Sequence, residues 1–209
     1  MLTGDPILML FIPALVAPSI PAVVRHAVVA FAEPLALAYV ASWIALYAHE
    51  IGHAVAARVL GVRIWGIRVG AGPTLYQGVV SGCHLRVGLF PLIGAVTLLD
   101  DDASAIGYRD IEPGRWRFEW NRQAWRAPVI TASGGIANLL VAFLAVAYWW
   151  LAGSPRLGTV IGDLFVYTFV ANLSGYLNLF PIFSSDGQHL LAHVTAARRV
   201  GREATPSAS

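Results

Sequence analysis

The sequence predicts an α-helical integral membrane protein with about four transmembrane helices and a membrane-associated β-hairpin region between the second and the third. Of its 209 residues 57% are hydrophobic and only 12% are charged, whereas a soluble domain carries roughly 25% charged residues. The charge is also segregated, because residues 100–126 hold much of it and long apolar runs hold almost none. The apolar runs are long enough to cross a bilayer as helices, because a spanning helix needs roughly 20 residues.

The four apolar segments are separated by short polar or proline-containing breaks. In the second segment, Pro34 is expected at a helix start or a kink. The first segment lacks a positively charged beginning and is interrupted by prolines, so we interpret it as a retained membrane segment and not as a signal peptide. The segments cover residues 6–24, 27–60, 129–151 and 159–180.

The distribution of arginine predicts the orientation of a multi-pass cell-membrane protein. All fourteen basic residues are arginines, and only Arg25 and Arg156 fall between segments one and two or between three and four. Because cytoplasmic loops are enriched in basic residues, both termini and the connection 61–127 are expected on the cytoplasmic side. We divide the chain into an N-terminal membrane segment (1–26), a core (27–190) and a tail (191–209).

The connection between the second and third segments predicts β-structure followed by an interfacial stretch. Residues 62–69, 74–80 and 83–90 are rich in β-branched and aromatic side chains, with glycine-containing breaks between them, as in hairpins. Residues 112–126 interleave tryptophan with arginine, which suits a segment at the membrane interface. The lipid bilayer is therefore an expected partner, and nucleic acid is not.

The strongest chemical signal is the HExxH motif formed by His49, Glu50 and His53. Residues four apart share one face of a helix, so both imidazoles can reach one metal ion. Glu50 is then placed beside the metal as a general base for an attacking water. The motif lies inside an apolar run, where ionisable residues are costly and indicate function.

A zinc site of this type needs a third protein ligand. Asp186 is favoured, because the fourth segment is expected to end on the cytoplasmic side, the same side of the membrane as the two histidines. Pro181 interrupts that helix, and Gly187 lets the backbone turn there. Several other side chains remain candidates from the sequence: His84, Glu112, Glu119, Asp163, His189 and His193.

The combination of motifs resembles the site-2 protease family of intramembrane zinc metalloproteases, of the M50 type. HExxH precedes an N-x-x-P-x-x-x-x-D-G element that runs from Asn178 to Gly187. Two shorter pieces, 134–138 (GGIAN) and 90–94 (FPLIG), are similar to further family elements, and the order of the pieces agrees. The loop 152–158 is too short for the PDZ domain that many bacterial relatives carry there, so we expect a compact form without it.

The resemblance implies specific roles for residues and a specific reaction. It implies one Zn²⁺ per chain on His49, His53 and Asp186, with Glu50 as the general base. It further implies that Asn178 helps to hold the substrate backbone and that Asn138 supports the site, although interhelical hydrogen bonding is the alternative for both.

The expected function is hydrolysis of a peptide bond in or next to the transmembrane segment of a membrane protein. Single-pass proteins such as anti-sigma factors, or remnant signal peptides, are the substrates that the resemblance implies. Two alternatives remain: a catalytically inactive scaffold or adaptor that retains the fold, and a membrane-anchored protease whose soluble catalytic part uses Glu112 or Glu119 as a ligand.

Overall fold

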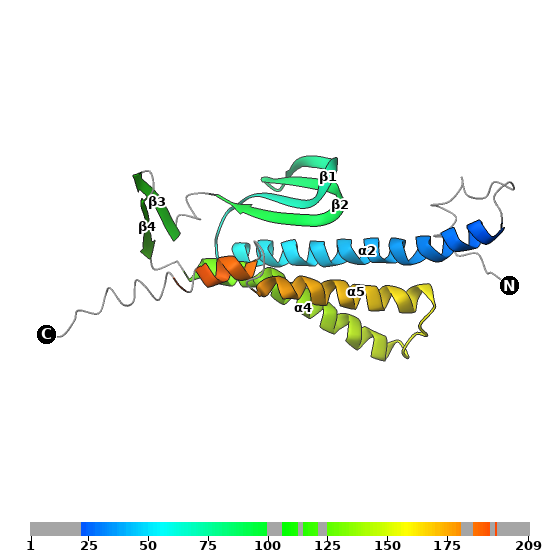
Figure 1. Cartoon of the computed structure of the whole chain (residues 1–209). Coiled ribbons are helices and arrows are strands. Elements are labelled where there is room, and N and C mark those ends of the chain that lie inside the picture. The colour runs from blue at the N-terminus through cyan, green and yellow to red at the C-terminus, as the bar shows by residue number, and fades with distance from the viewer. Residues whose placement is uncertain are drawn as a thin grey trace.

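The computed structural model describes residues 22–99, 106–112, 115–120, 125–180, 186–192 and 195, and only the backbone of 22–27, 29 and the two strands within 106–120. Three helices lie side by side (Figure 1). They contain three stretches that are long and apolar enough to cross a membrane: Ala30–Val59, Arg126–Leu151 and Val160–Leu179. The expected first span lies mostly outside the described residues, so three of the four expected helices are observed.

Helix α2 (Ala22–Val59) is one continuous helix of 38 residues. It begins before Pro34, which lies inside the helix and not at its first turn. Of the two alternatives expected for Pro34, the helix start is therefore wrong, and the kink remains a prediction. A proline removes one backbone donor from a helix, but the apolar residues on both sides of Pro34 continue the helical segment. Arg58 in the last turn is favourably placed at the negative end of the helix dipole.

Glycines allow the three helices to approach closely. A side chain at Gly52 of α2 would lie 2.6 Å from the carbonyl oxygen of Ser133 in α4 (Arg126–Leu151). A side chain at Gly175 of α5 (Val160–Tyr176) would collide with Asn138 of α4. Small residues at such crossings are typical of helices packed in a membrane. A 3-10 turn, η2 (Leu177–Leu179), then continues α5.

The interior of this helix bundle is more polar than its outside. Among the residues with described side chains, six polar or charged residues are buried, and many large apolar side chains are exposed, including Phe143 at 68% and Leu140 at 57%. This distribution is the one expected where lipid, not water, surrounds the helices. The buried polar residues are His49, Glu50, His53, Asn138, Thr168 and Asn172.

The region between α2 and α4 contains an antiparallel pair, β1 (Ile64–Val80) and β2 (Cys83–Leu98), joined by a turn with positive φ at Ser81 and Gly82. Both strands are bent, so that Ile67 is paired with Val96 on one side and with Leu85 on the other. The segment 94–98 therefore forms one edge of the sheet. The β-rich segments expected at 62–69, 74–80 and 83–90 are confirmed, the first two within β1 and the third within β2.

The β1–β2 hairpin lies along α2 and not beyond its end (Figure 1). The hydroxyl of Tyr39 donates to the carbonyl oxygen of Leu89 at 2.6 Å, and Gly70 packs directly against the ring of Trp43. At 1.5 Å per residue, Trp43 and Tyr39 lie about 24 and 30 Å along the helix axis from Val59. The hairpin consequently covers the part of α2 that carries the HExxH motif.

A second antiparallel hairpin follows, made of β3 (Ile106–Glu112) and β4 (Arg115–Trp120). It pairs Tyr108 with Phe118 and Arg109 with Arg117. The tryptophan- and arginine-rich stretch expected at the membrane interface thus begins as a strand. Its placement at the interface remains an expectation.

Candidate metal centre

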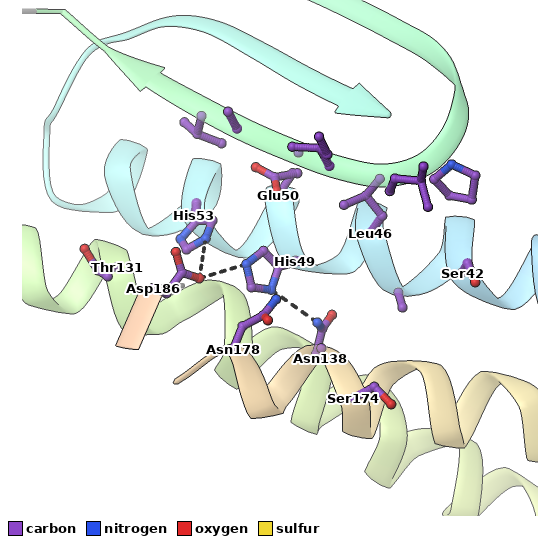
Figure 2. Close-up of a pocket in the computed structure, with 18 of the residues that line it drawn as sticks. Ser42, Leu46, His49, Glu50, His53, Thr131, Asn138, Ser174, Asn178 and Asp186 are labelled. Atoms are coloured by element: carbon purple, nitrogen blue, oxygen red, sulfur yellow. Dashed lines mark hydrogen bonds and ion pairs between the residues drawn. The ribbon is translucent and has the colours of Figure 1, made fainter. Parts of the chain in front are cut away.

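Two imidazoles of α2 and one carboxylate converge at the end of the helix bundle (Figure 2). Nε2 of His49 lies 2.8 Å from Oδ2 of Asp186, and Nε2 of His53 lies 3.3 Å from the same oxygen. The two rings stand nearly perpendicular, with centroids 4.7 Å apart. Among the described residues, these three form the one cluster of at least three potential ligands, with ligand atoms within 4.8 Å of one another.

Asp186 stands at the start of the described segment that follows α5 and η2. Residues 186–192 are helical, and Gly187 is buried with its Cα against the backbone of Leu179 and Phe180. Any side chain at Gly187 would collide with that backbone. The φ of Gly187 is not positive, so the glycine serves close approach here, and its part in a turn of the chain remains an expectation. Pro181 lies outside the described residues.

The three ligand atoms are spaced as a tetrahedral metal site requires. Metal–ligand bonds of 2.0 to 2.1 Å at tetrahedral angles place ligand atoms about 3.3 Å apart, close to the separations of both imidazoles from Asp186. Gly134 of α4 leaves the necessary space, because a Cβ there would lie 2.8 Å from Nε2 of His49 and even closer to Nε2 of His53. The residues present therefore fit a small divalent metal ion.

The other ring nitrogen of each histidine is held by α4. Nδ1 of His53 lies 2.6 Å from the carbonyl oxygen of Ile130, to which its N–H donates when Nε2 binds a metal. Nδ1 of His49 lies 3.2 Å from the side-chain amide of Asn138. Such partners fix the orientation of metal-binding imidazoles. Asn138, expected as a support residue, is thus in direct contact with His49.

Glu50 points away from the two histidines' ligand atoms and towards β2 (Figure 2). Only 3% of the residue is exposed, and its Oε2 has no hydrogen-bond partner among the described residues. A side chain at Gly94 of β2 would collide with the Glu50 carboxylate. A buried carboxylate oxygen with no protein partner can accept a hydrogen bond from water, which the adjacent cavity has room to hold.

That cavity has a volume of about 900 Å³ and opens between α2, α4, α5 and the β2 edge. Its wall combines the polar groups of the site with the strand segment from Pro91 to Val96. Asn178 also lies on its wall, close to His49 and Asp186 (Figure 2). The volume is in the range that accommodates a peptide segment or a similar ligand.

Asp186 is held in its ionised form. Burial alone raises the pKa of this carboxyl group, but the hydrogen bonds from His49 and His53 outweigh burial, and the resulting pKa lies well below the usual range. A carboxylate is the form that binds a metal ion.

The other sequence candidates for a third ligand lie elsewhere or outside the described side chains. The ring of His84 packs at a tilt against Trp65 of the hairpin, with 4.9 Å between ring centroids, and Asp163 accepts from the backbone N–H of Gly158 near the start of α5. His189 lines the cavity but is exposed. The side chains of Glu112, Glu119 and His193 lie outside the described residues.

Comparison with known proteins now identifies the family. The model of Peptidase family M50 matches residues 37–168, which include the HExxH motif, the β1–β2 hairpin, α4 and the first half of α5. The chain belongs to peptidase family M50. The resemblance to site-2 proteases is thereby confirmed.

Curated relatives agree with this assignment. The chain is 35% identical to the protease RseP of Yersinia pestis over 133 residues, which are 62% of this chain and 28% of that protein. It is 32% identical to the regulator of sigma-E protease RseP of Salmonella typhimurium, again over 62% of this chain and 28% of that protein. It is 29% identical over 127 residues to a Vibrio cholerae protein named "Putative zinc metalloprotease", covering 59% and 26%. The chain thus spans about a quarter of the length of these relatives.

Two contributors to this M50 site were missed in the sequence. Gly134 lies against both histidines, and Gly94 lies against Glu50. Both glycines stand within short pieces that resemble family elements (GGIAN and FPLIG), but nothing in those pieces indicates which residue they approach. The signal that could have found them is glycine itself, because a glycine inside an apolar helix or strand is costly and marks a close contact.

Proposed function

We propose that the chain is an intramembrane zinc endopeptidase, which hydrolyses a peptide bond in or next to the transmembrane segment of another membrane protein. The observation that carries the proposal is the convergence of His49 and His53 on Asp186, beside the unpaired carboxylate of Glu50. The family and the relatives named as proteases and zinc metalloproteases support it. Both termini are assigned to the cytoplasmic side of the cell membrane.

His49, His53 and Asp186 would hold the zinc ion, which when bound supplies a Lewis acid to activate water and the scissile carbonyl. Glu50 accepts the proton of the attacking water at its free Oε2 and passes it to the leaving amine. Ile130 and Asn138 keep the two imidazoles oriented during this step. Glu50 is buried between α2 and β2, so its carboxyl group is shielded from bulk water while it carries this proton.

The substrate is assigned to the cavity beside the β2 edge. Among the described residues, segment 94–98 is paired with β1 on one side only, and an unpaired strand edge can add an extended peptide as a further strand. An unwound transmembrane segment provides such a peptide. Asn178, on the opposite wall, is assigned to the substrate backbone, while Pro181 and Gly187 shape the segment that carries Asp186.

Single-pass membrane proteins are the proposed substrate class, such as anti-sigma factors or remnant signal peptides. The name of the Salmonella relative, regulator of sigma-E protease, favours the first. A single-pass helix is the simplest substrate that can unwind locally beside β2 without disrupting a bundle of its own.

The test uses purified protein in detergent with a panel of tagged single-pass model substrates. We expect cleavage that a zinc chelator stops and that added zinc restores. Glu50→Gln keeps the shape of the side chain but cannot accept a proton, so it should retain zinc and lose turnover by the 10² to 10⁴ typical of a general base.

Three outcomes of this test would count against the proposal. Cleavage by Glu50→Gln at the wild-type rate would remove the assigned mechanism. Loss of zinc in Glu50→Gln would make Glu50 a ligand. Zinc binding without cleavage of any substrate in the panel would favour the inactive scaffold.

A further inference from the structure

Two arginines lie side by side on the β1–β2 hairpin. Arg68 and Arg86 are directly paired in the sheet, so their side chains emerge on the same face with Cβ atoms about 5 Å apart. Both residues are exposed. The pair is a feature of the sheet register and not of the sequence, in which 17 residues separate the two arginines.

This pair lies on the face of the hairpin that is turned away from α2. Val69, next to Arg68, is only 2% exposed and is paired with Gly94, which packs against Glu50 of α2. Successive side chains of a strand alternate between the two faces. Arg68 and Arg86 therefore project outward, at the same level along α2 as the metal centre.

The positive charges have no protein counter-charge among the described residues. Neither arginine forms an ion pair there, and the one hydrogen bond is from Nε of Arg86 to Oγ1 of Thr74 at 3.1 Å. Like charges directly opposite each other destabilise a sheet. An anion between the two guanidinium groups removes this repulsion, and a phosphate matches the planar donor fork of arginine.

We propose that Arg68 and Arg86 bind the phosphate group of an anionic phospholipid. The hairpin lies along the part of α2 that can cross a membrane, so lipid is the neighbour of its outward face. At 1.5 Å per residue, the level of Glu50 is about 14 Å from the end of α2. A charged side chain at such depth is stable when it reaches a headgroup or water.

The surroundings of the pair also suit a lipid. Large apolar side chains of β1 are exposed, among them Trp65 at 52%, Leu75 at 61% and Val79 at 61%. These residues offer contacts for acyl chains, while the arginines hold the headgroup. A soluble phosphorylated partner would have no use for such an apolar border.

The proposed site has a consequence that rests on the proposed function. Peptide hydrolysis consumes water, and the catalytic Glu50 is buried beside β2. A lipid headgroup held on the outward face of the hairpin, at the level of Glu50, draws the polar boundary of the bilayer inwards to the level of the metal centre. Anionic lipid would thereby raise turnover without touching the substrate.

The test is native mass spectrometry of the full chain, released from nanodiscs that contain equal amounts of phosphatidylglycerol and phosphatidylcholine. We expect phosphatidylglycerol to be retained preferentially by the wild-type protein. Each arginine near an anionic surface contributes roughly a fivefold preference, so Arg68→Gln/Arg86→Gln should lower the retained ratio by roughly twentyfold. Arg68→Lys/Arg86→Lys, which keeps the charge but loses the planar fork, should give an intermediate ratio.

The matched control is Arg58→Gln/Arg156→Gln, which removes the same charge from two exposed arginines that are not paired in a sheet. It should lower the ratio clearly less than Arg68→Gln/Arg86→Gln does, because Arg58 and Arg156 are not paired and do not hold one phosphate group between them. The proposal would be overturned if both double variants lost phosphatidylglycerol equally. It would also be overturned if Arg68→Gln/Arg86→Gln retained phosphatidylglycerol as fully as the wild-type protein does. Zinc content and the thermal unfolding of each variant are measured in parallel. Lipid retention by the Glu50→Gln variant separates this site from catalysis, because retention is expected there even if no substrate is ever cleaved.

Discussion

The side-chain amide of Asn138 lies 3.2 Å from Nδ1 of His49, and both residues are buried. A neutral imidazole whose Nε2 binds a metal carries its proton on Nδ1, so this N–H needs an acceptor. Oδ1 of Asn138 is itself buried without a partner in the orientation that places Nδ2 beside His49. A rotation of the amide by 180° satisfies both atoms, with Nδ1–H of His49 donating to Oδ1. α4 thereby fixes the tautomer in which Nε2 of His49 can bind a metal.

Replacement of Asn138 should therefore weaken metal binding without removing a ligand. We expect Asn138→Leu to lower zinc affinity by about 10- to 100-fold, the range typical of groups that orient metal-binding histidines. Competition with a chromogenic chelator measures this affinity. Asn138→Asp keeps an acceptor oxygen and should stay closer to wild type. Equal affinity of the leucine and wild-type proteins would leave Asn138 with a helix-packing role only.

Gly134 provides a second test of the metal centre. A methyl group at this position would lie against Nε2 of both histidines, in the volume that the ion needs. We expect Gly134→Ala to fold and to lose zinc, as measured by elemental analysis of the purified protein. The neighbouring Gly135→Ala is a matched control, because its methyl group meets only the flexible side chain of Leu179, which can move. A zinc-replete Gly134→Ala protein would place the ion elsewhere.

The pairing of the two HExxH histidines on one helix face and the presence of spanning helices could be predicted from the sequence, because both depend on local spacing. A four-residue repeat places His49 and His53 on one helix face, and a run such as 129–151 exceeds the thickness of a bilayer. The β-rich composition of 62–90 likewise predicted strands. The convergence of Asp186 on the histidines was an expectation that combined the end of the last span with the resemblance of residues 178–187 to the family element N-x-x-P-x-x-x-x-D-G.

The close contacts could not be predicted, because they join elements that are far apart in the chain. Gly134 meets His53 and Gly94 meets Glu50 only once α4 and β2 have packed on α2. The register that pairs Arg68 with Arg86 depends on the bends of β1 and β2. The sequence left open whether Pro34 starts α2 or lies within it; Pro34 lies within it, since the apolar helix on either side outweighs the loss of one backbone hydrogen bond.

Metal content should depend on all three proposed ligands. Purified protein is expected to hold about one zinc per chain, and alanine at His49, His53 or Asp186 should lower that occupancy strongly. For Asp186→Ala the reason is the loss of the oxygen that lies nearest to both Nε2 atoms. His189→Ala is the control from the same cavity wall. Full occupancy in Asp186→Ala, with loss in His189→Ala, would move the third ligand to His189.

The membrane topology can be tested with reporter fusions. If both termini lie on the cytoplasmic side, a fusion after Ser209 should report the cytoplasm. A fusion within the loop 152–158, between α4 and α5, should report the opposite side, because each of these helices crosses once. A cytoplasmic signal from the loop fusion would contradict the orientation that the arginines predict.

The contact between Gly94 and Glu50 separates positioning of the base from binding of the metal. Gly94 sits on the strand edge proposed for the substrate, and a methyl group there would collide with the Glu50 carboxylate. Glu50 would then have to rotate away from the attacking water, whereas the three ligands would be untouched. We expect Gly94→Ala to retain full zinc content and to lose turnover by about 10²-fold or more, the contribution of a general base.

Gly78→Ala is the matched control for this prediction. It adds the same methyl group to the same hairpin, but there it meets only the hydroxyl end of the Tyr76 side chain. We expect its turnover to stay within a few-fold of wild type, so that a loss in Gly94→Ala alone cannot be attributed to a weakened hairpin. The effects of Gly94→Ala on kcat and on KM are also informative when they are measured separately. A displaced base lowers kcat, whereas an obstructed strand edge raises KM for the substrate. If Gly94→Ala were as active as Gly78→Ala, β2 would not position Glu50, and the proton would have to be taken by a group that does not contact this strand.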